Sequence, residues 1–324
     1  PPPTPSQVRI IDYGVQRARL LKQTARAYAF KAAALWMRGR MSSLDGGGKG
    51  RGGGKGAEAP PDLAEAHAAS AGLKGLCTML AVDGLEDLRK CCGGVCFLSF
   101  VFSLSLTHTQ PFVPTCHTSH SFLYYSPRTF YSFPLARPGL GYLNASGIGG
   151  FEANFKWLVT ADGDWVVMLL QTARYLYKSL AAARERKPLS AFAQCLAPLG
   201  ELPHDAQSAN QRLRPPEPAS ALELESPEPL LAWFEYRAAV QVATVGAKLD
   251  SRVANGEAFD GAWNLCAPQL LRAATSHCHA FILHQALAMA RAATDRPCAA
   301  VLARLAAYLA LAEMVGDGGW QGRD

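Results

Sequence analysis

Apolar residues recur at helical spacing through most of this 324-residue chain, and this periodicity constrains its fold more than any other feature. Between Thr160 and Glu185 the apolar positions advance by three or four residues: Val167, Leu170, Ala173, Leu176 and Leu180. This spacing places one apolar stripe along a single face of a helix. Alanine is abundant and β-branched residues are sparse outside short runs, which also favours helix. The sequence therefore predicts an all-α fold.

Five further segments are predicted to be helices. They are Ser6–Met41, Asp62–Cys92, Leu230–Leu249, Trp263–Ala293 and Pro297–Val315. The second of them follows two prolines, a pattern typical of a helix start. We interpret the residues from 141 to 158 as a glycine-bearing connection.

Composition changes divide the helices into two groups. The tract Gly46–Gly56 cannot hold a regular element and is interpreted as a flexible loop. It has no flanking strand and no Lys-Ser/Thr ending, so it is not a phosphate-binding loop. Many of the prolines lie between residues 187 and 229, which predicts a linker. We expect a helical bundle over residues 1–186, the linker, and a second helical domain over residues 230–324.

The segment from residue 95 to about residue 140 differs from its surroundings. It contains no acidic residue, its only charged residues are Arg128 and Arg137, and it shows no sustained periodicity. Structureless stretches of this length are uncommon inside compact domains. We expect a disordered insertion that is foreign to the fold. Its apolar run, Val95–Leu106, is too short to span a bilayer, so no membrane insertion is predicted.

The net charge and the spacing of the cysteines limit which classes of function the sequence predicts. The net charge is +6, and much of the excess lies on the first predicted helix. That basic face is either solvated or a site for a polyanionic cofactor such as a nucleotide pyrophosphate. No basic patch is interleaved with aromatic residues, so nucleic acid is not a predicted partner. Nine cysteines without paired CxxC spacing favour free thiols in a reducing compartment.

His277, Cys278, His279 and His284 form the most concentrated group of candidate metal ligands. His277 and His279 are two residues apart and therefore lie on different faces of a helix. Since no third well-spaced ligand is present, we favour a structural role and predict no metal site.

An acidic turn precedes the helix that ends near Glu185. It contains Asp162 and Asp164 on either side of Gly163. The positive end of the helix dipole favours ionised carboxylates there. Such an acid is either an N-cap or, beside a buried face, a candidate catalytic base.

Several ordered stretches then resemble one family. They are Arg9-Ile10-Ile11-Asp12-Tyr13 with Gln16, Leu63-Ala64-Glu65-Ala66-His67, Asp83-Gly84-Leu85-Glu86-Asp87 leading to Gly93-Gly94, Leu170-Gln171-Thr172-Ala173-Arg174, and Trp263-Asn264. Together they resemble the C-terminal helical region of peroxisomal acyl-CoA oxidases. The resemblance covers nearly the whole chain except the glycine tract and the acid-free segment.

The resemblance implies a chemistry. Acyl-CoA oxidases are FAD-dependent enzymes of peroxisomal fatty acid β-oxidation, homodimeric in the complete protein. They desaturate acyl-CoA to trans-2-enoyl-CoA and pass the electrons to O2, which gives H2O2. A carboxylate removes the proton next to the thioester carbonyl. The family has Glu at this position, and the matching residue here is Asp162, with Asp164 the next candidate; the Asp side chain is shorter by one carbon.

The resemblance also assigns cofactor-binding positions. Gly93, Gly94, Gly141 and Tyr142 match a turn that lies near the flavin in this family. Arg9 and Gln16 match a region that meets the cofactor of the partner subunit. In the family the two halves of the turn are continuous, so we predict that residues 95 to about 140 are a translated intron or a misjoined exon. The family's N-terminal helical and central β-domains have no counterpart, and the first residue is Pro, so we expect an incomplete chain.

Two alternatives remain. An acyl-CoA dehydrogenase would pass electrons to a protein carrier, but the second helical domain argues against it. A non-catalytic helical interaction module, or an inactive portion of the enzyme, would show no flavin absorbance and no peroxide formation.

Overall fold

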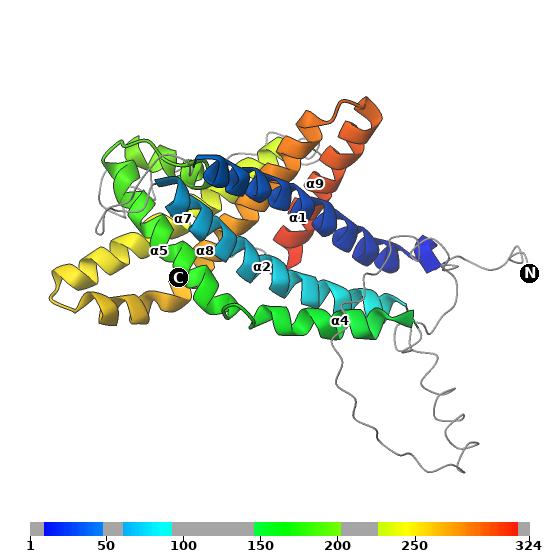
Figure 1. Ribbon diagram of the computed structural model, residues 1–324, viewed down its shortest axis with the longest axis horizontal. Coiled ribbons are helices and arrows are strands. Elements are labelled where there is room, and N and C mark those ends of the chain that lie inside the picture. The colour runs from blue at the N-terminus through cyan, green and yellow to red at the C-terminus, as the bar shows by residue number, and fades with distance from the viewer. Residues whose placement is uncertain (1–9, 48–60, 93–145, 202–225, 317–324) are drawn as a thin grey trace, which may run out of the picture. The chain divides into compact units, whose positions relative to one another are not determined.

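The structure is a computed structural model that describes residues 10–47, 61–92, 146–201 and 226–316. The elements are η1 (Ile10–Asp12), α1 (Gly14–Gly47), α2 (Pro61–Cys91), α4 (Ile148–Lys156), η5 (Trp157–Val159), α5 (Trp165–Arg184), η6 (Ala191–Glu201), α7 (Pro227–Ala254), α8 (Phe259–Ala292) and α9 (Arg296–Gly316). No strand occurs in these ranges (Figure 1). The prediction of an all-α fold is confirmed.

The helices predicted from periodicity lie where they were expected. The predicted helix at residues 62–92 matches α2 closely, and the one at residues 263–293 matches α8 apart from its first turn. The first predicted helix begins later, at Gly14, and continues two residues into the glycine tract. Helix α7 starts at Pro227, earlier than predicted, because proline fits the first helical position, where its missing N–H is not needed.

Two short elements lie in segments that the sequence predicts to be irregular. Helix α4 occupies most of the glycine-bearing connection, and η6 lies inside the proline-rich linker. In η6 the side chains of Phe192, Leu196 and Leu199 are buried. These elements were missed because each is stabilised by contacts with distant parts of the chain rather than by its own sequence.

The described residues belong to two compact units. One contains residues 1–20 and 82–156, and the other contains residues 21–81 and 157–324. Helices α1 and α2 each contribute to both. The domain boundaries proposed from composition, at residues 186 and 230, stay a prediction.

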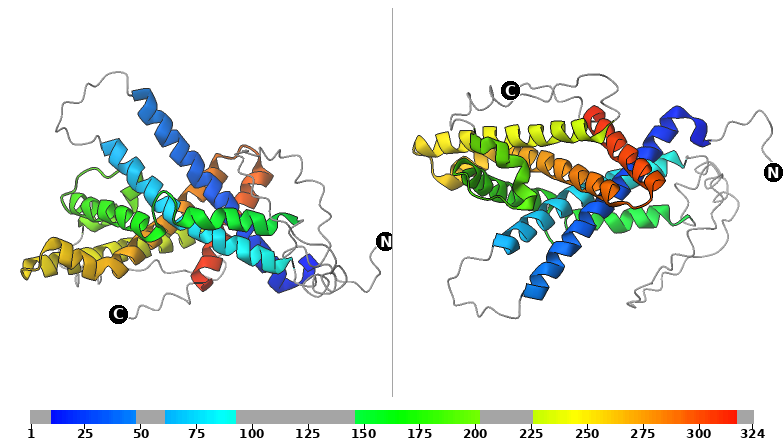
Figure 2. Two further views of the ribbon diagram at one scale, coloured as in Figure 1. Left: turned by 60° about the horizontal axis from the view of Figure 1, so that its bottom comes forward. Right: turned by 90° about the horizontal axis from the view of Figure 1, so that it is seen from above.

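The core of the second unit is built around α7 and α8, which lie side by side (Figure 2). Helices α5 and α9 pack against α8, and η6 packs against α5 and α7. Many of the fully buried side chains are alanines and large aliphatic residues, among them Leu230, Leu249, Leu270, Ala274 and Leu287. Small alanines let the helix axes approach closely, and the leucines fill the space between them.

Helix α9 is long and apolar enough to cross a membrane by length and composition, with a mean hydropathy of 1.7 over Arg296–Val315. Its Ala306, Ala307, Leu309 and Ala310 are buried, and it packs against α7 and α8. A core helix of a soluble protein has the same composition.

Candidate catalytic turn and its surroundings

The acidic turn lies between η5 and α5. The backbone N–H groups of Thr160 and Ala161 both donate to the carbonyl of Trp157, at 3.1 and 2.8 Å. Asp162 follows with φ of 56° and Gly163 with φ of 116°. These left-handed conformations suit Gly, which has no Cβ, and Asp is among the few other residues that adopt them readily. This left-handed turn lies directly before the N-cap of α5.

Asp164 is the N-cap of α5. Its Oδ1 accepts a hydrogen bond from the backbone N–H of Val166 at 2.9 Å, and its carbonyl accepts from Met168 at 2.9 Å. One of the two acids is thus committed to satisfying an otherwise unpaired N–H of the first helical turn.

Asp162 has a different environment, since its side chain is exposed. The first buried residue of α5 is Leu169. Of the two acids, Asp164 is the N-cap of α5 and Asp162 is exposed; a catalytic role for Asp162 stays a prediction.

Helix α5 is fixed against α2 by a polar contact within the apolar interface. Thr172 is fully buried, and its Oγ1 donates to the carbonyl of Ala68 at 2.8 Å. Ala68 belongs to α2, so this bond fixes the position of α5 along α2.

Most of the predicted flavin-binding residues, Arg9, Gly93, Gly94, Gly141 and Tyr142, lie outside the described residues. Gln16 is described. Its Nε2 donates to the carbonyl of Cys91 at 3.3 Å, and its Oε1 accepts from Arg19 at 3.4 Å. Gln16 therefore contacts the last turn of α2, directly before the predicted glycine turn.

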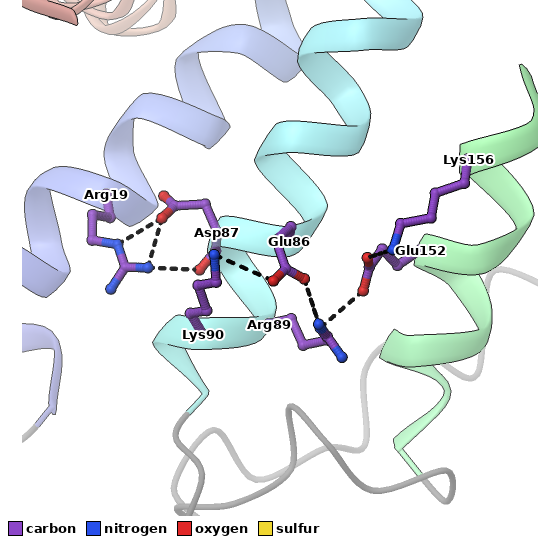
Figure 3. A network of polar contacts seen from close by, with 7 residues as sticks. All are labelled: Arg19, Glu86, Asp87, Arg89, Lys90, Glu152 and Lys156. Atoms are coloured by element: carbon purple, nitrogen blue, oxygen red, sulfur yellow. Dashed lines mark hydrogen bonds and ion pairs between the residues drawn. The ribbon is translucent and has the colours of Figure 1, made fainter. Parts of the chain in front are cut away.

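A network of charged side chains joins the start of α1, the end of α2 and α4 within the first unit (Figure 3). Arg19 makes bonds of 2.8 and 2.6 Å to Oδ1 of Asp87. Arg89 pairs with Glu152 at 2.8 Å and also with Glu86, while Lys156 pairs with Glu152 at 2.6 Å. Glu152 is only 2% exposed, so its carboxylate depends on these cations. The network holds together the helix ends that flank residues 93–145.

The basic face of α1 is largely paired inside the protein. Arg26 and Glu313 are both 8% exposed, and Arg26 Nε lies 2.7 Å from Glu313 Oε1. Lys22 lies 3.5 Å from the same carboxylate, and Arg40 pairs with the buried Glu65. Lys22, Arg26 and Arg40 are thus ion-pair partners within the protein. Arg17, Lys31 and Arg38 of the same helix are exposed, as a solvated face predicts.

The four residues of the histidine and cysteine group all lie on α8, and His277 and Cys278 are buried there. His277 Nδ1 is 3.3 Å from Cys195 Sγ. Burial lowers the pKa of His277 to about 4, against a smaller opposing effect of a backbone hydrogen bond with Phe192. Burial also raises the pKa of Cys195 to about 12. Both groups are neutral at pH 7, so the pair lacks the thiolate that a cysteine nucleophile needs.

The other members of the histidine and cysteine group lie in different environments. Burial raises the pKa of Cys278, and His284 is exposed and lies 3.3 Å from Glu235. In the parts of the chain that the structure describes, no three side chains of His, Cys, Asp or Glu are grouped as metal ligands.

Sequence reasoning missed Glu152 and Cys195. Glu152 lies in a segment interpreted as a connection, and Cys195 in one interpreted as a linker. Because their partners, Arg89 and His277, are 63 and 82 residues away in sequence, no local signal identified them.

Two family models match the chain. The acyl-CoA oxidase C-alpha1 domain matches residues 2–117, and the acyl-CoA oxidase model matches residues 226–319. The first match ends inside the acid-free segment, whose foreign origin stays a prediction.

Curated relatives carry the same name. The peroxisomal acyl-coenzyme A oxidase 1 of Homo sapiens is 28% identical over 280 residues, which are 86% of this chain and 33% of the relative. The Arabidopsis thaliana protein of that name is 27% identical over 289 residues, with 87% and 33% covered. The chain thus spans about a third of the length of these relatives.

Solved structures show the same fold. The acyl-CoA oxidase-1 of Caenorhabditis elegans, complexed with FAD and ATP, is similar with a TM-score of 0.69 and 23% identity over 96% of this chain and 37% of that one. The Arabidopsis thaliana acyl-CoA oxidase 1 gives a TM-score of 0.68 and 24% identity over 96% and 38%. With models of one family at both ends and relatives of one name over most of its length, the chain belongs to the acyl-CoA oxidase family.

Proposed function

We propose that this chain is the C-terminal part of a flavin-dependent acyl-CoA oxidase and that Asp162 is its catalytic base. The reaction converts acyl-CoA and O2 into trans-2-enoyl-CoA and H2O2. One observation carries the assignment of the base: of the two acids in the turn, Asp164 caps α5, and Asp162 is exposed at the position where the family has Glu.

Asp162 would remove the proton from the carbon next to the thioester carbonyl. A base of this kind must come within hydrogen-bond reach of that proton. The Asp side chain is shorter than Glu by about 1.5 Å. The backbone at Asp162 and Gly163 is left-handed, and Ala161, where the family has an aromatic residue, leaves room for the backbone to adjust to the shorter side chain.

FAD is part of the proposal, and when bound it accepts the hydride from the neighbouring carbon and passes the electrons to O2. The described residues do not by themselves form its site. A cavity among them, lined by Phe30, Leu80 and His279, measures about 20 Å³, which is room for a single water molecule. Gln16 contacts the end of α2 that precedes the predicted glycine turn. Support for FAD comes from the family and from C. elegans acyl-CoA oxidases 1 and 2, both solved with it.

The substrate, assembly and location follow from the same family. The C. elegans acyl-CoA oxidase-2 was solved with ascaroside-CoA, and the curated relatives are named peroxisomal. We propose acyl-CoA and O2 as substrates, a homodimer of the complete protein, and the peroxisome as its location. Because Asp162 is exposed among the described residues, the dry pocket that tunes a base must be completed by residues beyond them.

Two isosteric variants in the complete parent oxidase test the base. Asp162→Asn should abolish peroxide release with palmitoyl-CoA, because an amide cannot take the proton. Asp164→Asn should keep activity near that of the parent, since Asn caps a helix as well as Asp does. Asp162→Glu should retain or raise activity. An active Asp162→Asn enzyme together with an inactive Asp164→Asn enzyme would move the base to Asp164.

The chain alone gives a second test. Purified by itself, it should release no peroxide from palmitoyl-CoA and should show weak or no flavin absorbance. Clear turnover by this chain would contradict the view that the pocket needs further residues. A complete protein that binds no flavin and oxidises no acyl-CoA would support a non-catalytic helical module instead.

A further inference from the structure

Lys74, in the middle of α2, contacts the candidate catalytic turn directly. Its Nζ donates a hydrogen bond to the backbone carbonyl of Gly163, 89 residues away in sequence. The contact is partly buried. We infer that Lys74 is a positioning residue that fixes the turn and thereby the direction of the Asp162 side chain. This inference rests on the proposed function of Asp162.

Two glycines on α2 let neighbouring helices pack closely against it, and Lys74 lies beside them. A Cβ at Gly72 would lie 2.7 Å from Thr172 Oγ1 and 2.6 Å from Cys278 Sγ. A Cβ at Gly75 would lie 3.0 Å from the carbonyl oxygen of Trp165. Gly75 is therefore at a position where the start of α5 touches α2, and Gly72 at one where Thr172 of α5 and Cys278 of α8 approach it. Lys74 is adjacent to Gly75, and its ammonium group contacts the turn that precedes α5.

The turn needs such a contact because its backbone conformation is unusual. Asp162 and Gly163 are both left-handed, and the Gly163 carbonyl forms no part of the helix that follows. A hydrogen bond from an ammonium group is about twice as strong as a neutral one. It fixes the peptide unit between Gly163 and Asp164, one residue beyond Asp162, and so restrains the left-handed turn that carries the Asp162 side chain. A base displaced by about 1 Å can lose on the order of a hundredfold in rate.

Hydrogen exchange on the chain itself tests the contact without relying on activity. Lys74→Met keeps the length of the side chain and removes the donor. We expect the amides of residues 160–168 to exchange on the order of tenfold faster, while those in the remainder of α5 keep their rates. Lys74→Arg should restore most of the protection. The matched control is Lys178→Met, which removes an exposed lysine of α5 and should change neither region.

Turnover in the complete parent oxidase tests the consequence. Lys74→Met should lower peroxide release per bound flavin by about tenfold or more. The KM for palmitoyl-CoA should stay within about threefold, because binding is not what the contact controls. Substrate deuterated at the carbon next to the carbonyl should show a larger isotope effect than in the parent, since proton removal becomes slower. Lys74→Arg should recover most of the rate.

The outcomes separate this inference from the proposed function. Unchanged exchange at residues 160–168 and unchanged turnover per flavin in Lys74→Met, with Asp162→Asn inactive, would overturn the inference and leave Asp162 as the base. If Asp162→Asn is fully active, the proposed base is wrong whatever Lys74 does, and the exchange experiment still decides whether Lys74 fixes the turn. A loss of folded protein that Lys74→Arg does not rescue would also contradict a positioning role.

Discussion

Asp162 and Asp164 are only two residues apart, yet their backbone conformations give them different roles. Asp164 has an extended ψ of 143°, which aims its carboxylate back at the N–H of Val166. Asp162 has a φ of 56° and is exposed. The side-chain oxygens of Asp164 are therefore used by the helix, and those of Asp162 face solvent.

The left-handed conformation of Asp162 predicts an order of stability among variants at this position. Asp162→Gly should be more stable than Asp162→Ala by about 1 kcal/mol, because only Ala places a Cβ against the following carbonyl oxygen. Urea unfolding of the two variants of this chain measures the difference. Equal stabilities would mean that residue 162 relaxes to an ordinary conformation when its carboxylate is removed.

At the scale of elements, α4 is the clearest case of a helix made by its neighbours. It has only nine residues and includes Gly149 and Gly150, so it is too short to be stable alone. Its one buried residue is Glu152, which pairs with Arg89 of α2 and with Lys156. The ion pair, not an apolar stripe, determines where α4 packs.

Removing the charge of Arg89 should therefore destabilise α4. Arg89→Met leaves Glu152 buried without its partner from α2, and the expected loss is on the order of 3 kcal/mol. Hydrogen exchange across residues 148–156 should rise strongly in this variant.

The neighbouring Lys90→Met is its control, because Lys90 is exposed and contacts Glu86 rather than Glu152. This variant should change stability by less than about 0.5 kcal/mol, as is typical of surface charges. Similar exchange at residues 148–156 in both variants would show that α4 does not depend on the Arg89–Glu152 pair.

At the scale of the whole molecule, the buried His277 couples stability to pH. Its pKa is lowered to about 4 in the folded chain, while an unfolded histidine titrates near 6.5. At a pH between these two pKa values, His277 binds a proton in the unfolded chain but not in the folded chain. Stability from this group is therefore complete above pH 6.5 and is lost as the pH falls towards 4, by up to about 3 kcal/mol.

Replacing the histidine should flatten this dependence. Urea unfolding of His277→Gln between pH 4 and 6.5 should show a smaller loss of stability on acidification than the parent chain shows. His284→Gln, which changes an exposed histidine, should keep the slope of the parent. Equal slopes in all three proteins would show that His277 takes up its proton without unfolding.

Most of the helices and the family were predictable from the sequence. The predicted apolar steps along α5, α7 and α8 reflect a geometry that repeats every 3.6 residues, so a local stretch is enough to identify it. In α5 the steps at Ala173, Leu176 and Leu180 are buried as predicted, but Val167 is 50% exposed and Leu169 is buried instead. The family could be recognised because short stretches such as Leu170-Gln171-Thr172-Ala173-Arg174 keep their order along the chain. Asp162 as the candidate base came from that order.

Tertiary structure alone decided which acid of the turn caps α5, that residues 148–156 form a helix, and that Lys74 contacts Gly163. In each case the deciding contact depends on backbone angles or on a partner far away in sequence: 63 residues for Arg89 and Glu152, and 89 for Lys74 and Gly163. Local periodicity carries no information about such pairs. The sequence by itself determined the long helices and indicated the candidate base, and the packing of those helices determined how the turn that carries Asp162 is held.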